Sequence, residues 1–294
     1  MKFARIAHEG APRVVVVEYE AWALLPGEID DLHTLIEGAA DAMAYVRRAL
    51  RTAPRVAADE DHLLAPLGRF RRDVLFTGWN YVDHFHEGAG RREGQDVDLP
   101  QHPTFFGKSP HTVIGPRDPI AFDERISTQW DYEAELALVI GRRGRSIPVS
   151  RAADHVWGYL LANDVSQRDL QRAHGGQWLK GKSIDRTMPI GPWVVTADEV
   201  EPTDIRLRCT INGDLMQDAS TGAMAYPIPT LVEELSFGMT LDVGDLVLTG
   251  TPSGVGNARD PRRFLRSGDE VIVSGTGLGE LRNVVTPVAL HTPG

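Results

Sequence analysis

The sequence predicts a mixed α/β fold rich in β-strands, with a small N-terminal α/β domain at residues 1–66 and a larger domain at residues 67–294. Beyond residue 66, short runs of Val, Ile and Leu are separated by Gly, Pro and Asp, a pattern typical of many short strands joined by turns. Before residue 66, a strand-like run is followed by a stretch with helical spacing. The change of pattern places the boundary between the two parts.

Within the N-terminal part, residues 14–19 (VVVVEY) are predicted to form a strand. Residues 29–51 have the apolar spacing of a helix, carried by Leu32, Leu35, Ile36, Ala40, Met43 and Val46. Residues 54–66, which begin and end with proline, are interpreted as a connector.

In the larger part, strands are predicted at residues 72–77, 133–140, 156–162, 193–196, 206–211, 246–249 and 270–274. Helices are predicted at residues 150–154, in a short stretch from residue 166, and at residues 228–237, where Pro229 suits the first turn. Asn212-Gly213 indicates a two-residue hairpin turn.

Composition narrows the classes of function. A chain of 294 residues, 42% of them hydrophobic, can build a large core and is long enough to be an enzyme. A formal net charge of −10 argues against nucleic acid as a partner. Cys209 is the only cysteine, so no intrachain disulfide or cysteine-based zinc site can form, and a cytoplasmic location is expected. The N-terminus lacks the apolar stretch of a signal peptide, and no segment reaches the ~20 apolar residues of a membrane helix.

Two acids open the predicted strand WDYEAELALVIG. Glu133 and Glu135 are two residues apart, so in an extended chain their side chains share one face. Taken alone, such a pair is more often the solvated end of an edge strand. However, residues 130–140 contain no Lys or Arg, and two buried carboxylates at close range would raise the pKa of one another. A hard divalent cation such as Mg²⁺ would remove that repulsion.

A third oxygen ligand is available where a second predicted strand ends. The apolar run from residue 156 stops at Asn163-Asp164, and Ser166 with Asp169 resembles a capping box that would start a helix there. Asp164 in isolation is more often a turn residue. Beside a strand that carries two glutamates, it becomes a plausible metal ligand.

Seven ordered blocks between about residues 78 and 285 carry a family resemblance: GWNYVDHFHE, PTFFGKSP, DYEAELALVIGR, GYLLANDVSQRDLQ, GKSIDRTMPIGPWVV, INGDLMQ and LDVGDLVLTGTPSGVG. The sequence resembles the fumarylacetoacetate hydrolase family, in the form of its smaller bacterial and mitochondrial, acylpyruvase-like members. The resemblance implies a β-sandwich or β-roll core with peripheral helices, and a homodimer.

The resemblance also implies a metal centre. Glu133, Glu135 and Asp164 match the family's ligands for one divalent ion, usually Mg²⁺ or Mn²⁺, with Ca²⁺ as a further candidate.

Three further residues match the family's catalytic groups. His84 and Glu87 are three residues apart, so one helical turn would let the carboxylate orient an imidazole that takes a proton from water. Without the family context they would be a surface His and Glu. Lys182, in GKSID, matches a lysine placed against developing negative charge.

Other residues are assigned to substrate or to structure. Arg168 and Gln171 lie one helical turn apart and can hold substrate oxygens, and Thr251 and Tyr81 are further expected substrate contacts. Two more residues in matched blocks receive no site role. They are Lys108, for which contact with ligand is left open, and His86, which is interpreted as structural because no HExxH-type zinc pattern is present.

By resemblance, the expected activity is hydrolytic cleavage of a C–C bond in a small β-diketo acid, such as an acylpyruvate or fumarylpyruvate, as in the catabolism of aromatic compounds. Decarboxylation, isomerisation or dehydration of a keto acid on the same site is the alternative. A noncatalytic metal- or metabolite-binding relative is a second alternative, from a different class. The polar, glycine-containing segment 82–100 is expected to be a lid that orders when a keto acid binds.

Overall fold

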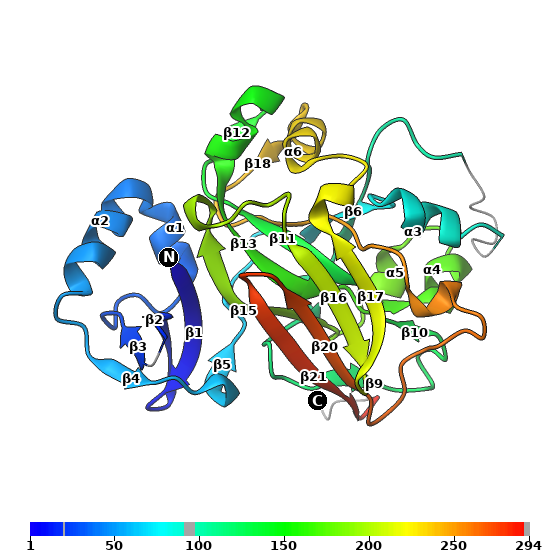
Figure 1. The fold of residues 1–294 in the computed structure, drawn as a ribbon, viewed down its shortest axis with the longest axis horizontal. Coiled ribbons are helices and arrows are strands. Elements are labelled where there is room, and N and C mark those ends of the chain that lie inside the picture. Colours follow the sequence, from blue (N-terminus) through cyan, green and yellow to red (C-terminus); the bar gives the residue numbers. More distant parts are fainter. Residues whose placement is uncertain (20, 91–97, 291–294) are drawn as a thin grey trace.

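The computed structural model describes residues 1–19, 21–90 and 98–290. Two β-sheets are stacked face to face, with helices at the periphery and the N-terminal part beside one end of the larger sheet (Figure 1). No helix of the described residues is long and apolar enough to cross a membrane.

The larger sheet runs through both parts of the chain. Its order is β4 (Arg55–Ala57), β3 (Ala21–Leu24), β2 (Ala11–Val16), β1 (Lys2–His8), β15 (Met188–Thr196), β13 (Val156–Asn163), β11 (Ala134–Ile140), β19 (Leu246–Leu248), β6 (Val74–Gly78) and β7 (Thr104–Lys108). The short strands β5 (Leu63–Leu64) and β8 (Val113–Ile114) pair with β1 and β15. Because β1 pairs with β15, the sheet is continuous between the N-terminal part and the rest of the chain.

The smaller sheet has the order β17 (Asp214–Ser220), β16 (Arg206–Ile211), β20 (Glu270–Gly275), β21 (Gly279–Pro287) and β9 (Ile120–Phe122). The predicted turn between β16 and β17 is confirmed: Asn212 and Gly213 have φ of 52° and 87°, and Ile211 pairs with Asp214. Two further pairs of strands are β10 (Trp130–Asp131) with β14 (Ser166–Gln167), and β12 (Gly144–Arg145) with β18 (Thr240–Leu241).

The α-helices are short. They are α1 (Leu32–Glu37), α2 (Ala39–Ala49), α3 (Val82–Glu87), α4 (Arg168–Ala173), α5 (Leu179–Lys182) and α6 (Ile228–Ser236). Single turns of 3₁₀-helix lie at η1 (Glu60–His62), η2 (Pro110–Thr112), η4 (Ala197–Glu199), η5 (Thr221–Ala223) and η6 (Gly256–Ala258), with a longer one at η3 (Val149–His155).

Strand β11 is buried along its whole length because both faces of the larger sheet are covered. Leu136, Leu138 and Ile140 belong to the core that also contains residues of the smaller sheet. Ala137 and Val139 belong to a second core with residues of β1 and α1. The alternation follows from the period of two in a strand.

Several boundaries differ from the sequence-based predictions. The helix expected at residues 29–51 is two helices that meet at Gly38. The helix expected at residues 150–154 is the 3₁₀ turn η3, and the connector at residues 54–66 contains β4, η1 and β5. Ser166 does not cap a helix: its hydroxyl donates to the carbonyl of Asp164, and α4 begins at Arg168 without a side-chain cap.

The expected lid lies partly outside the described residues. Val82–Glu87 forms α3, whereas residues 91–97 are not among those that the structure describes. Lid closure therefore stays a prediction.

Candidate active site

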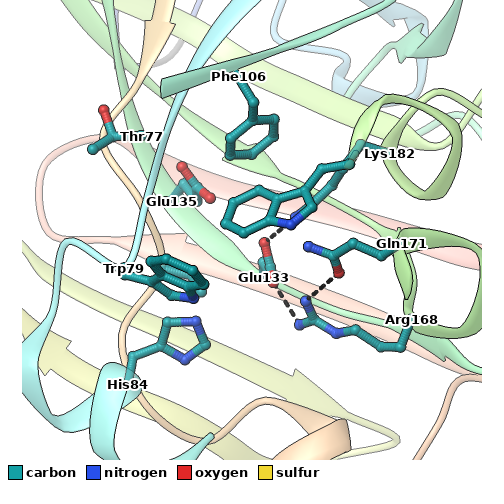
Figure 2. A pocket seen from close by; sticks show the side chains of 12 residues that line it. Thr77, Trp79, His84, Phe106, Glu133, Glu135, Arg168, Gln171 and Lys182 are labelled. Atoms are coloured by element: carbon teal, nitrogen blue, oxygen red, sulfur yellow. Dashed lines mark hydrogen bonds and ion pairs between the residues drawn. The ribbon is translucent and has the colours of Figure 1, made fainter. Parts of the chain in front are cut away.

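A cavity lies at the ends of β11 and β6 (Figure 2). Its lining residues are Thr77, Gly78, Trp79, His84, Phe106, Glu133, Glu135, Arg168, Gln171, Trp178, Lys182 and Thr251. Seven of them were predicted as site residues from the sequence: His84, Glu133, Glu135, Arg168, Gln171, Lys182 and Thr251.

Three carboxylates meet because of the register between β11 and β13. Ala134 pairs with Asn163 and Glu135 with Ala162, and the amide of Asp164 donates to the carbonyl of Glu133 at 2.9 Å. Glu133 and Asp164 are therefore directly opposite, on the same face as Glu135. The three groups are buried, and one ligand oxygen from each lies within 4.8 Å of the others.

Two buried lysines pair with these carboxylates. The ammonium of Lys182 lies 2.7 Å from Glu133 Oε2 and 2.6 Å from Asp164 Oδ2. Lys108, at the end of β7, lies 2.7 Å from Asp164 Oδ1 and donates to the carbonyl of Val165 at 3.0 Å. Lys108 is fully buried and is not among the residues that line the cavity, so it supports Asp164 from behind.

Arg168 connects the cavity to a carboxylate that the sequence analysis missed. Its guanidinium donates to Asp131 at 2.8 Å, to Glu133, and to Gln171 Oε1 at 3.2 Å. Asp131 is fully buried and also accepts the amide hydrogens of Gly256 and Asn257. The one feature of the sequence that could have indicated Asp131 is its place in the same block as the two glutamates. In the structure, the pairing of β10 with β14 brings Asp131 to Arg168.

The surroundings of the two glutamates push their pKa values apart. Burial raises the pKa of Glu133, but Lys182 and Arg168 outweigh it and lower this pKa to about 2. Burial, together with the negative charges of Asp164 and Glu133, raises the pKa of Glu135 well above its usual value. Within the described residues Glu135 has no ion pair, and it accepts the amide hydrogen of Gly250 at 2.8 Å.

The residues present fit a hard divalent cation. Three carboxylates at short mutual distance offer oxygen donors only, which Mg²⁺, Mn²⁺ and Ca²⁺ prefer. Burial and the negative charges of Asp164 and Glu133 disfavour the charged form of Glu135, whose pKa is raised, and no ion pair within the described residues offsets this. A divalent ion held by Glu133, Glu135 and Asp164 would offset it.

The expected dyad on α3 is formed. His84 Nδ1 lies 2.7 Å from Glu87 Oε1, and the other oxygen of Glu87 accepts the amide hydrogen of Gly254 at 2.7 Å. Because a carboxylate only accepts, Nδ1 carries the hydrogen and Nε2 of a neutral His84 is left as the base. His84 lines the cavity that contains the carboxylates (Figure 2).

Two other expected substrate contacts are placed differently. The hydroxyl of Thr251 donates to the carbonyl of Ala134 and accepts from Gln217, so the residue lines the cavity while its hydroxyl is engaged. Tyr81 is buried and is not among the lining residues of the cavity. Burial and the charge of Glu135 raise the pKa of its phenol. His86 is exposed, away from the carboxylate cluster.

Comparison with known proteins identifies the family. The family model "Fumarylacetoacetate (FAA) hydrolase C-terminal" matches residues 73–286. The chain belongs to the fumarylacetoacetate hydrolase family. It is an enzyme of this family and is 43% identical over 227 residues to the oxaloacetate tautomerase YisK of Bacillus subtilis, covering 77% of this chain and 73% of that protein.

Solved structures of this family have the same fold. A fumarylacetoacetate hydrolase from Exiguobacterium antarcticum is 36% identical, with a TM-score of 0.84 over 98% of this chain and 100% of that one. A maleylpyruvate hydrolase from Sphingobium sp. SYK-6, solved with manganese(II) and pyruvate, is 25% identical, with a TM-score of 0.79 over 98% of this chain and 100% of that one. The predicted β-rich fold of the family is therefore confirmed.

Some lining residues were not predicted from the sequence. The aromatic residues Trp79, Trp178 and Phe106, together with Thr77, cover the side of the cavity beside the carboxylates. Trp79 and Phe106 lie in blocks that matched the family, and Thr77 and Trp178 lie within three residues of one, but an aromatic side chain at such a position is more often part of a core. No charge or spacing marked these residues as cavity residues.

Proposed function

We propose that this protein is a divalent-metal-dependent tautomerase, which interconverts the keto and enol forms of a small 2-oxo acid. The observation that carries the proposal is the shared cavity: the His84–Glu87 dyad and the three carboxylates line or adjoin one space. The name oxaloacetate tautomerase of a relative at 43% identity supports this reaction type.

The chain's own residues account for the proton transfer. Arg168 and Gln171 face the cavity and can orient the oxygens of the substrate. In the keto-to-enol direction, His84 takes a proton from the carbon next to the keto group and gives it to the enolate oxygen, and the reverse transfer forms the keto acid; Glu87 fixes the imidazole through Nδ1. The ammonium of Lys182, held by two carboxylates, places positive charge where the oxyanion develops. A divalent ion held by Glu133, Glu135 and Asp164 would supply a Lewis acid beside those oxygens.

Hydrolysis of an acylpyruvate C–C bond is the second candidate. It is favoured by the geometry of the dyad, because an imidazole held by a carboxylate can take a proton from water as well as from carbon. The relative named maleylpyruvate hydrolase has this kind of activity in its name. Decarboxylation or dehydration of a keto acid uses fewer of the groups that the cavity presents.

The test compares reactions in the same preparation. The parent enzyme is expected to accelerate the decay of the oxaloacetate enol, followed by its ultraviolet absorbance, with Mn²⁺ or Mg²⁺ and not with EDTA. Acylpyruvates assayed in parallel measure hydrolysis. A parent enzyme that is active on neither with metal present would overturn both candidates.

The variant His84→Ala separates the base from the metal centre. It should retain metal affinity, measured by calorimetry, and lose ~10²–10⁴-fold in tautomerisation or acylpyruvate hydrolysis. Any oxaloacetate decarboxylation should change much less, because it needs no base. Tautomerisation at the parent rate in this variant would exclude His84 as the base.

The homodimer and the cytoplasmic location are proposals that rest on the family resemblance and the composition. We also propose that the substrate is a small keto acid and that the protein has no nucleic acid or membrane partner.

A further inference from the structure

Three aromatic rings form one side of the cavity, and we name them the aromatic wall: Trp79, Trp178 and Phe106. The ring centroids of Trp79 and Trp178 are 5.1 Å apart at 78°, and those of Phe106 and Trp178 are 5.0 Å apart at 71°. These are edge-to-face contacts, which hold each ring in a defined orientation. In Figure 2, Trp79 lies above His84, and Phe106 lies near Glu135 and Lys182.

The aromatic wall is anchored in the core. Phe106 stacks on the buried Phe76 with centroids 5.0 Å apart, and Trp79 meets Phe85 edge to face. Trp178 packs on Gly78, where an added Cβ would lie 2.6 Å from the indole carbon Cζ3. Because residue 78 has no side chain, the indole of Trp178 can pack directly against the backbone at this position.

The backbone of Trp79 is held in an unfavourable conformation. Its φ is 57°, a left-handed value that is rare for a bulky residue. Such outliers persist where the surrounding structure fixes them, and they cluster at functional sites. Here the conformation places an indole against the cavity, between Gly78 and the dyad helix α3.

The aromatic wall continues out of the cavity. Trp79 and Trp178 also line a second, neighbouring space. Its other lining residues include the apolar Val255 and Ala258 and the polar Glu87, Arg172 and Asn257. His84, Arg168 and Gln171 line both spaces. A ligand with its polar end at the carboxylates can therefore extend along the two indoles.

The cations that line the two spaces are engaged within the protein. The two cations that line the inner cavity, Lys182 and Arg168, already pair with Glu133, Asp164 and Asp131. In the outer space, the guanidinium of Arg172 donates to Gln129. The outer space is polar at Arg172 and Asn257 and aromatic along the two indoles.

We propose that the aromatic wall is a subsite for the tail of the substrate, and that it favours 2-oxo acids with a planar, apolar substituent, such as arylpyruvates, over 2-oxo acids without one. The inference rests on the proposed function for the 2-oxo acid end of the ligand. Aromatic rings are well suited to this selection because they offer a large apolar face at fixed orientation.

Binding can be measured apart from turnover. Calorimetry of the Mn²⁺-loaded protein would compare phenylpyruvate with pyruvate, which share the 2-oxo acid end and differ in the ring. The expected result is that phenylpyruvate binds ~10-fold or more tightly than pyruvate, as a ring packed against two indoles allows.

Two variants test the residues. Trp79→Gly removes the indole and suits the left-handed backbone, so the fold should tolerate it. Trp178→Leu keeps an apolar side chain and removes the ring. Each should lower the affinity for phenylpyruvate ~10-fold and change that for pyruvate by less than ~3-fold. The matched control is Trp193→Phe, because Trp193 lines a different cavity and should leave both affinities unchanged.

The outcomes distinguish the two proposals. Equal affinity for phenylpyruvate and pyruvate in the parent protein would overturn the aromatic subsite and leave the proposed function standing. The aromatic subsite is also excluded if both variants bind phenylpyruvate as tightly as the parent does. If neither ligand binds the metal-loaded parent, the proposed function is wrong and this inference falls with it.

Discussion

At the scale of single residues, Glu135 differs from the carboxylates beside it in what surrounds it. Glu133 and Asp164 each face cations at hydrogen-bonding distance, from Lys182, Arg168 or Lys108. Glu135 has a backbone amide and, within the described residues, no cation. A charge that is buried without a partner destabilises the fold unless something neutralises it.

The variant Glu135→Gln should therefore act in opposite directions on stability and on metal binding. In EDTA, its Tm should equal or exceed that of the parent, because Gln replaces a carboxyl whose ionisation is unfavourable at this buried position. In Mn²⁺, the parent should gain stability by ligand binding and the variant should gain much less. Differential scanning calorimetry measures both, and Glu124→Gln, at an exposed position, is the control. An equal Mn²⁺-dependent gain in both proteins would remove Glu135 from the ligand set.

At the scale of elements, α3 presents His84 and Glu87 one turn apart, so the helix itself sets the dyad. The amide of Gly254, in the loop after β19, holds the second oxygen of Glu87. Base and orienting group are therefore fixed by two separate segments of the chain.

The variant Glu87→Gln should reduce kcat and leave metal affinity unchanged, because Glu87 does not contact the carboxylate cluster. A Gln side chain orients the imidazole less well and does not stabilise its protonated form. The loss should lie between the parent rate and that of His84→Ala, for which ~10²–10⁴-fold is expected. Steady-state kinetics at saturating Mn²⁺ would measure it, with the exposed Asp83→Asn on the same helix as the control. A loss in Asp83→Asn as large as in Glu87→Gln would contradict a specific role for Glu87.

Elements with local signals were predicted well from the sequence. The β16 strand has the predicted bounds, because the Asn-Gly turn fixes one end and alternation marks its length. The positions where apolar runs begin and stop made Glu133, Glu135 and Asp164 candidates, and the family resemblance assigned them as metal ligands.

Elements that depend on distant pairing were not predicted. Lys108 reaches Asp164 because β7 pairs with β6, which places Lys108 opposite Val74. Asp131 reaches Arg168 through the two-residue ladder between β10 and β14. Neither pairing can be predicted from the residues of one segment alone, because each depends on contacts between residues far apart in the sequence.

At the scale of the whole molecule, the N-terminal part and the rest of the chain share one core. Phe3 pairs in register with Val194 of β15, and both belong to a buried cluster with Leu32 of α1 and Leu160 of β13. The boundary between residues 66 and 67 marks a change of pattern along the sequence. The packing joins the two parts through a common apolar layer, so they should unfold together.

The variant Phe3→Ala tests this cooperation. Phe3 is fully buried, so its loss leaves a cavity and should lower the free energy of unfolding by about 3–5 kcal/mol. Because the residues around it come from both parts, the whole chain should melt in one transition at a lower Tm. Urea denaturation followed by circular dichroism and by tryptophan fluorescence should give coincident curves for the parent and for Phe3→Ala, with the milder Phe3→Leu as a second variant if Phe3→Ala does not fold. The control Tyr19→Ala, at a side chain that is 99% exposed, should change stability by less than about 0.5 kcal/mol. Two separate transitions, with the second at the midpoint of the parent, would show that residues 67–294 fold independently of the N-terminal part.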